Sequence, residues 1–474
     1  MRQRLTKLFL AASCAALVIT KAGAADYAAG LAIDTEASHN DNIRMVPSDK
    51  TSVRKYDISP KLTFGINTET TKAQLDSTFN FNRYDKSEFN SDDQNIALAL
   101  SHQFESSSVG LNASYIHNST LTSELLTTGR VGTRADRSEQ YMVSPNWTYT
   151  INEKNLVQLS GTYTTQNYEN ASYIGYKNTG AELDWTHSLG ERTKLTVAAT
   201  YSDYKTDDIK LGGVPSSGFQ YITSDPTSPG VFAQILPGEY VGTIPANNFG
   251  EQSYAARTKN EGGQIGASYL ITEQSQLSGY LGRSRNTNMY TIKDPKDVCS
   301  NADYTRLISE YSQGLLVPLR GSLSALCGSI PQTDAWLSTA QINWTWSSER
   351  QQLKLNGSKA TQPTSNGYAV DALQLGSNWS YQLSELDKIS ASVSLVRNRA
   401  IDKKNTAQNI TTQIADRNYG SATLQYQRQL SEYWFLNASF QFSEQKYTQI
   451  DYQASSRVYS LGISYKPQQW HWAR

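Results

Sequence analysis

Residues 457–466, near the end of the chain, alternate strictly between two kinds of side chain. Tyr459, Leu461, Ile463 and Tyr465 occupy one face of an extended segment, and small or polar residues occupy the other face. The same two-faced segment recurs about eighteen times along the chain, with an apolar face and a polar face each time. This alternation predicts a transmembrane β-barrel, because lipid covers the outside of such a barrel and water wets its inside.

The connections between these segments alternate in length. Turns of about four residues close the even-numbered segments, at 67–71, 105–108, 152–155, 190–193, 272–275, 347–350, 384–387 and 431–434. Longer polar loops close the odd-numbered ones, and the two longest are 206–253 and 290–333. The pattern predicts an all-β, single antiparallel up-and-down barrel of about 18 strands, with short periplasmic turns and long extracellular loops. Each of the two longest loops could also hide a hairpin, which would raise the count.

Aromatic residues gather beside the short turns. They are Trp147, Tyr149, Trp185, Trp344, Trp346, Trp379, Tyr381, Tyr433 and Trp434. Tyr and Trp are enriched where a membrane meets water, so this clustering indicates an aromatic girdle at the periplasmic rim. Aromatic side chains in the core of an ordinary β-sandwich are the alternative interpretation.

The N-terminus has the pattern of an export signal. Residues 1–7 are basic, residues 8–20 are a short apolar run, and Ala22 and Ala24 frame a small-residue cleavage site. Cys14 raises a lipoprotein alternative, although the apolar run continues past it. We therefore predict a signal peptide over residues 1–25, and one barrel domain over residues 26–474 in the outer membrane of a Gram-negative bacterium.

Composition and motifs exclude several classes of function. Removal of the signal peptide would remove four basic residues and no acidic one, so the remaining chain has no basic excess that would point to nucleic acid. No apolar run is long enough for a membrane-spanning helix. No catalytic, phosphate-binding or metal-binding motif occurs. The sequence therefore predicts no enzyme activity, cofactor or metal.

Two cysteines follow the signal peptide, Cys299 and Cys327, and both lie in the second long loop. In an exported protein such a pair predicts a disulfide bond. Its loop of roughly 28 residues would contribute about 3–4 kcal/mol to stability in the chain-entropy model.

The polar face of the strands should line the lumen. It consists mainly of Ser, Thr, Asn and Gln, with few charges, and such a wall can exchange hydrogen bonds with sugar hydroxyls or simply hold water. The lumen-lining candidates are Asp57, Lys61, Asp76, Glu182, Asp184, Lys354, Gln374, Asn378 and Lys466. A register slip of one residue would invert this assignment.

The two long loops are longer than connections usually are without a role. One or both could fold into the lumen as a constriction or gate, since an eighteen-stranded barrel would otherwise hold a wide water channel. A cap on the outer surface is the alternative.

The last segment resembles the signal by which outer-membrane barrels are recognised by the barrel-insertion machinery. Ser460, Gly462 and Tyr465 match its polar residue, glycine and aromatic residue. The chain departs from the pattern at its end, because residues 467–474 follow where most such proteins stop at an aromatic residue.

More specifically, the chain resembles the β-barrel porins associated with exopolysaccharide export. The likeness rests on recurrent Ser-Glu turns after aromatic strands, as in residues 379–385 and 426–432, and on the lack of a plug. It implies translocation of a secreted polysaccharide across the outer membrane, in contact with membrane lipid and with a periplasmic polysaccharide-export protein as partner. A diffusion porin for small hydrophilic solutes and a structural or adhesive surface barrel are the alternatives.

Overall fold

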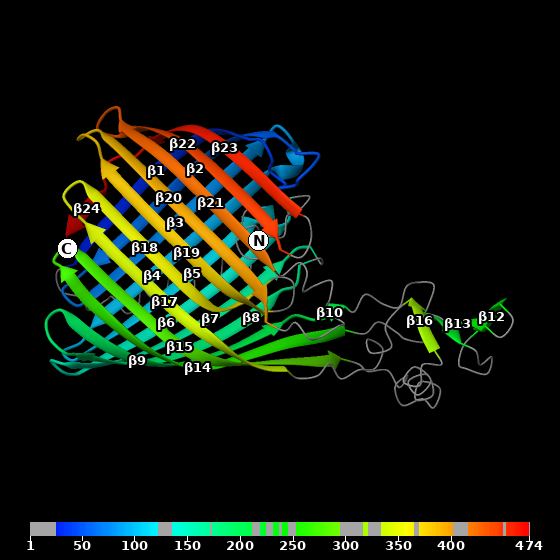
Figure 1. Ribbon diagram of the computed structural model, residues 1–474. Coiled ribbons are helices and arrows are strands. Elements are labelled where there is room, and N and C mark those ends of the chain that lie inside the picture. Colours follow the sequence, from blue (N-terminus) through cyan, green and yellow to red (C-terminus); the bar gives the residue numbers. More distant parts are fainter. Residues whose placement is uncertain are drawn as a thin grey trace.

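A computed structural model gives the fold of this protein (Figure 1). It describes residues 25–121, 135–170, 173–210, 219–223, 231–236, 239–244, 253–293, 316–320, 333–364, 369–401, 416–448 and 452–473. In this part of the chain, no helix has the length and apolar character needed to cross a membrane.

Eighteen strands form the wall of a closed barrel. They are β1 (Asp26–Asn40), β2 (Val53–Asn67), β3 (Thr71–Tyr84), β4 (Ser91–Gln103), β5 (Ser107–Ser119), β6 (Arg137–Asn152), β7 (Asn155–Tyr168), β8 (Tyr176–Ser188), β9 (Thr193–Thr206), β14 (Ser253–Thr272), β15 (Ser275–Lys293), β17 (Thr333–Ser347), β18 (Gln351–Pro363), β19 (Ala369–Gln382), β20 (Asp387–Ala400), β21 (Arg417–Gln429), β22 (Trp434–Tyr447) and β23 (Tyr452–Tyr465).

Each wall strand pairs antiparallel with the next wall strand in sequence, and β9 pairs with β14. The barrel closes where β1 pairs with β23, from Ile33 opposite Tyr465 to Asn40 opposite Val458. Short turns join the strands at one end and longer connections join them at the other, as the left and right ends of the barrel in Figure 1 show. The predicted fold class is confirmed.

Side-chain alternation explains why these segments form a wall. Ile58, Leu62 and Phe64 on β2 share one face and are all exposed, with Phe64 retaining 50% of its surface. An exposed apolar face is costly in water, but lipid can cover it. The face opposite to these residues is therefore the inner face of the barrel.

The end of the chain adds to the predicted strands. The sequence carried no prediction for residues 467–474, and Trp470–Ala473 forms a further strand, β24, which pairs with Asp26–Ala29 of β1. Between Tyr465 and Trp470 the chain advances five residues opposite four of β1, so the strand resumes after a bulge. The Trp472 and Tyr27 rings stack at 5.6 Å. The final strand thus also ends in aromatic residues.

The two longest loops contain strands that do not join the wall. The first loop contributes β11 (Phe219–Thr223), β12 (Val231–Leu236) and β13 (Glu239–Ile244), and the second contributes β16 (Leu316–Arg320). These four pair with one another in a separate sheet, which lies beyond the end of the barrel in Figure 1. Only β10 (Ile209–Lys210) adds to the wall, beside β14. The described parts of these loops therefore do not form the expected constriction.

Candidate functional site: the inner face and the extracellular mouth

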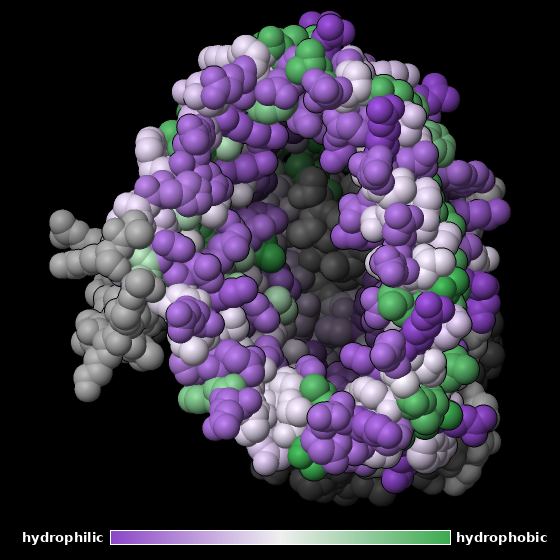
Figure 2. Space-filling view, turned by 90° about the vertical axis from the view of Figure 1, so that its left-hand side faces the viewer, coloured by the Kyte–Doolittle hydropathy of each residue, from purple (hydrophilic) through white to green (hydrophobic). Residues whose placement is uncertain are grey.

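The strand register places eight of the nine lumen-lining candidates on the inner face, and Lys466 follows the last paired residue of β23. Directly opposite residues of paired strands share a face. Asp57 lies opposite Asn82, while its neighbour Ile58 lies opposite Phe81 on the lipid face. The same reasoning, strand by strand, applies to seven more: Lys61, Asp76, Glu182, Asp184, Lys354, Gln374 and Asn378. Figure 2 looks into the short-turn end, where hydrophilic side chains surround a central hollow.

On one side of the barrel the inner charges neutralise each other. Lys61 Nζ lies 2.5 Å from Asp34, and Lys55 Nζ lies 2.9 Å from Asp57 and 3.5 Å from Glu36. Two of these pairs join β2 to β1, and the Lys55–Asp57 pair lies within β2, so two lysines meet three carboxylates. The ion pairs in this part of the wall therefore present little net charge to the lumen.

On β8 the inner charges are of one sign. Glu182 and Asp184 are two residues apart on the same face, so their carboxyl groups are neighbours. Within the described part of the chain, neither carboxylate has an ion-pair partner; uncharged Ser160 and Gln158 lie opposite them on β7. This section of the wall therefore attracts cations, whereas the β1–β2 section does not.

The other candidates are held by polar or aromatic neighbours. Gln74 Nε2 donates to Asp76 at 2.8 Å, and Gln374 Nε2 donates to Gln362 Oε1 at 3.0 Å. Lys354 and Asn378 lie opposite each other on β18 and β19, and both are exposed. Lys466 Nζ lies 5.0 Å from the centre of the Phe435 ring.

At the extracellular end of the lumen, a shorter loop, residues 41–52 between β1 and β2, packs against the inner wall. Met45 of this loop is only 1% exposed and packs against Val396, Tyr419 and Ala454. Those residues lie on the inner faces of β20, β21 and β23. Gln445 Nε2 and the Tyr452 hydroxyl both donate to the Met45 carbonyl oxygen. The loop thus folds onto the inner wall.

Asn42 fixes the shape of this loop. Its side-chain amide donates to the carbonyl oxygens of Val46, at 2.8 Å, and Ser455, at 2.9 Å. Its own oxygen accepts the Val46 amide at 3.2 Å. Met45 and Asp49 have φ angles of 49° and 52°, which non-glycine residues rarely adopt. Local backbone strain of this kind persists only where surrounding contacts hold it in place.

The other side of the loop contacts the next two extracellular connections. Ile43 packs against a buried cluster of Val53, Phe89 and Leu121. Arg44 forms an ion pair with Glu88 at 3.0 Å, and its guanidinium lies 5.5 Å from the centre of the Phe89 ring. The loop therefore joins the inner face of β20–β23 to the connections that follow β3 and β5.

A second inward contact lies across the mouth. The Tyr204 hydroxyl on β9 donates to the Thr364 carbonyl oxygen, just after β18, at 3.0 Å, and both residues are buried. In the wall, β14, β15 and β17 separate β9 from β18. The β17–β18 ladder ends at Ala340 and Lys359, although β18 continues to Pro363. The end of β18 has thus left its place beside β17 and approaches β9.

Sequence reasoning missed the residues that narrow the mouth. Asn42, Met45 and Thr364 lie in connections, where alternation carries no information about direction. Arg417 lies on the inner face of β21 and is 1% exposed. Its guanidinium lies 4.9 Å from the centre of the Tyr419 ring. An arginine at an inward position near a strand end was the only sequence signal available.

The residues of the expected insertion signal lie at the closing seam. The Ser460 and Ser439 hydroxyls are 2.6 Å apart, and the Tyr465 and Trp434 rings are 4.9 Å apart. A Cβ at Gly462 would lie within 2.4 Å of the Thr35 carbonyl oxygen, so the seam requires glycine here. Recognition by the insertion machinery stays a prediction. The predicted signal peptide, apart from Ala25, and the predicted Cys299–Cys327 disulfide lie outside the described residues.

The described residues include no group of three or more His, Cys, Asp or Glu side chains arranged to hold a metal ion. The neighbouring carboxylates of Asp92 and Asp93, on β4, are both paired with arginines. Asp92 pairs with Arg83 at 2.7 Å, and Asp93 pairs with Arg137 at 2.9 Å.

A closed barrel with a lipid-compatible outer face, aromatic residues beside the short turns and a polar inner face defines the class of this protein. Only helices and closed barrels satisfy their backbone hydrogen bonds within a bilayer, and closed barrels of this kind belong to outer membranes. The protein is an outer-membrane β-barrel of a Gram-negative bacterium.

Several solved structures are similar to this chain at low sequence identity. The Pseudomonas aeruginosa OccK2 (OpdF) structure is 9% identical, with 93% of this chain and 97% of that chain covered and a TM-score of 0.39. A P. aeruginosa FadL homologue is 11% identical, with 93% and 90% covered and a TM-score of 0.30. The Escherichia coli ferric-catecholate import receptor Fiu is 10% identical, with 92% and 81% covered and a TM-score of 0.41. No protein-family model and no curated protein sequence matches the chain.

Proposed function

We propose that this barrel is a gated outer-membrane conduit for a hydrophilic polymer, a secreted exopolysaccharide. The observation that carries the proposal is the inner face, where small hydroxyl and amide side chains continue from the short-turn end to the mouth. Such groups both donate and accept hydrogen bonds, and so can replace the water around sugar hydroxyls. A periplasmic export protein would deliver the polymer to the short-turn end.

The charge pattern supports an uncharged or weakly charged cargo. Lys55 and Lys61 are satisfied by acidic partners on β1 and β2. A wall of this kind exerts little long-range attraction on an anion, whereas a strongly anionic cargo calls for unpaired basic residues. Inward aromatic residues at the mouth, among them Tyr419 and Tyr452, offer ring faces to sugars once the 41–52 loop moves away.

A diffusion porin for small hydrophilic solutes is the second candidate. The loop that folds over the mouth favours it, because a narrow passage admits small solutes without any gate movement. The two candidate functions differ in one requirement: a polymer can pass only if the 41–52 loop moves, whereas small solutes can pass without this movement.

Single-channel conductance in planar bilayers separates the two candidates. We would compare the intact protein with a variant in which a short Gly-Ser connection replaces residues 43–50. A polymer conduit should have a small conductance that rises several-fold in the variant, and long neutral glucans should then block the current. A large, steady conductance in the intact protein, unchanged by the replacement, would contradict the gated conduit and favour the porin.

A matched control replaces residues 219–244 of the long loop, which carry β11, β12 and β13. These strands lie beyond the barrel end, so we expect conductance to stay within about twofold of the intact value. Absence of current in every form would favour a structural or adhesive role.

A further inference from the structure

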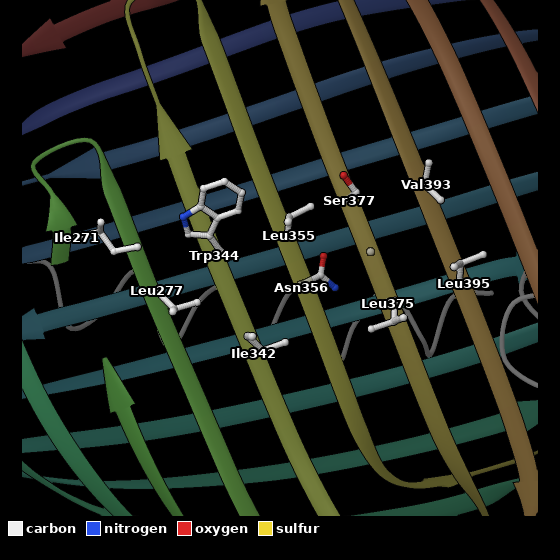
Figure 3. Close-up of a pocket in the computed structure, with 11 residues that line it drawn as sticks. Ile271, Leu277, Ile342, Trp344, Leu355, Asn356, Leu375, Ser377, Val393 and Leu395 are labelled. Carbon is white, nitrogen blue, oxygen red and sulfur yellow. The ribbon is translucent and has the colours of Figure 1, made fainter. Parts of the chain in front are cut away.

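The outer face of β14–β22 has two adjoining hollows, which share Leu375 and Leu395 and are together called the groove. One part has a volume of about 560 Å³ and is lined almost entirely by apolar side chains, including Ile342, Trp344, Leu355, Leu375 and Leu395 (Figure 3). It begins at Ile271, beside a short periplasmic turn, and rises towards β20.

A second part, of about 410 Å³, continues the groove towards the extracellular ends of β20–β22. Leu375 and Leu395 line both parts. The upper part is still mainly apolar, but it adds the polar side chains of Arg397, Asn418, Glu444 and Lys446. The whole groove is therefore apolar through the membrane and basic at its extracellular end.

The basic end is built across three neighbouring strands. Arg397 lies opposite Asn418, and Asn418 lies opposite Lys446. All three side chains are exposed on the outer face. Adjacent strands are about 4.8 Å apart, so the two cations are on the order of 10 Å apart with an amide donor between them. Glu444 lies one row below and accepts a hydrogen bond from Gln453, which leaves two cations against one carboxylate.

A glycine, Gly420, lies next to the Arg397–Asn418–Lys446 row, on its periplasmic side, and leaves the groove open there. Gly420 lies between Leu395 and Glu444, and a Cβ there would lie 3.2 Å from Leu395 Cδ2. A larger side chain would fill the passage that joins the apolar part to the basic part.

We propose that this groove is a binding site for a phosphorylated glycolipid of the outer leaflet, the lipid A portion of lipopolysaccharide. Its acyl chains lie along the apolar part, and a phosphate group binds between Arg397 and Lys446, with Asn418 as a further donor. The assignment follows from position and charge. The basic end is on the extracellular side, where the outer leaflet lies, and anionic lipid headgroups bind basic pockets at a membrane surface. The site is independent of what passes through the lumen.

The test is native mass spectrometry of the folded, detergent-solubilised protein with diphosphorylated lipid A, dephosphorylated lipid A or phosphatidylglycerol. We expect stoichiometric adducts with diphosphorylated lipid A, and at least tenfold fewer in the double variant Arg397→Gln, Lys446→Gln. The matched control is Lys259→Gln with Arg283→Gln, which removes the same charge from the outer faces of β14 and β15 outside the groove. It should bind as the native protein does.

Three results would overturn the proposal: equal losses in both double variants, equal binding of phosphatidylglycerol, or equal binding of dephosphorylated lipid A. The variant Gly420→Leu keeps every charge and narrows the groove. It should also lose adducts, and native-level binding by this variant would refute the acyl-chain path. Heat-modifiable mobility in gels confirms that each variant is folded, and conductance is measured separately, so failure of this proposal is distinct from failure of the conduit.

Discussion

The two ends of the inner face have the same sequence pattern and opposite accessibility. Near the short turns, Lys354 and Asn378 are exposed to the lumen. Near the mouth, Asn286, Arg417 and Gln445 also lie on the inner face, but they are almost completely buried. For Gln445 the difference comes from the 41–52 loop, because the Gln445 side-chain amide donates to the Met45 carbonyl oxygen. Alternation thus determines which face a residue occupies, and connections determine whether a solute can reach it.

The largest expected effect comes from releasing the mouth loop at Asn42. Asn42→Ala removes three hydrogen bonds, two with Val46 and one with Ser455. At about 1 kcal/mol each, this should shift the closed-to-open ratio by about 150-fold. Open probability in planar bilayers is the measurement.

The same substitution at the other end of the lumen is the control for this comparison. Asn378→Ala on exposed β19 should leave open probability unchanged. Equal effects of the two variants would show that the two ends do not differ in the way proposed.

A smaller effect is expected across the mouth. Tyr204→Phe removes the donor to the Thr364 carbonyl oxygen and keeps the ring. A loss of about 1 kcal/mol predicts an open probability about fivefold higher. If the current of Tyr204→Phe is indistinguishable from the native current, the contact does not help to close the mouth.

Ion selectivity tests whether the β8 section of the wall attracts cations more strongly than the β1–β2 section does. Replacing Glu182 and Asp184 by Gln and Asn should reduce cation preference by about twofold to threefold in 0.1 M salt, and Lys61→Gln should increase it by exposing Asp34. Reversal potentials measure both. The effects should vanish at 1 M salt, where the Debye length is about 3 Å. Shifts in the same direction would contradict the contrast.

The last effect, on stability and not on conduction, is expected at the periplasmic end of the closing seam. Trp472→Ala removes the ring stacked on Tyr27, and aromatic pairs contribute about 1 kcal/mol beyond their buried area. Urea unfolding in detergent should detect a loss of this size. Trp470→Ala in the same strand should cost less, since no ring contact of Trp470 is found among the described residues. Equal losses would mean that the stack itself does not stabilise the seam.

The sequence by itself determined the wall. The alternation of apolar and polar residues, together with the regular short turns, predicted the eighteen strands. The same alternation placed Asp57, Glu182 and Lys354 on the inner face. These features are local: a residue's face follows from its position along its own strand and from the few residues that set the turn.

Only the tertiary structure decided what closes the mouth and where the outer groove lies. Met45 meets Val396 and Tyr419 across more than 300 residues of sequence, and the Arg397–Asn418–Lys446 row exists only once three strands are in register. The length of the two longest loops suggested the constriction, but length carries no direction. Connections lack the alternation that would orient them, so their contacts depend on the wall that the rest of the chain builds.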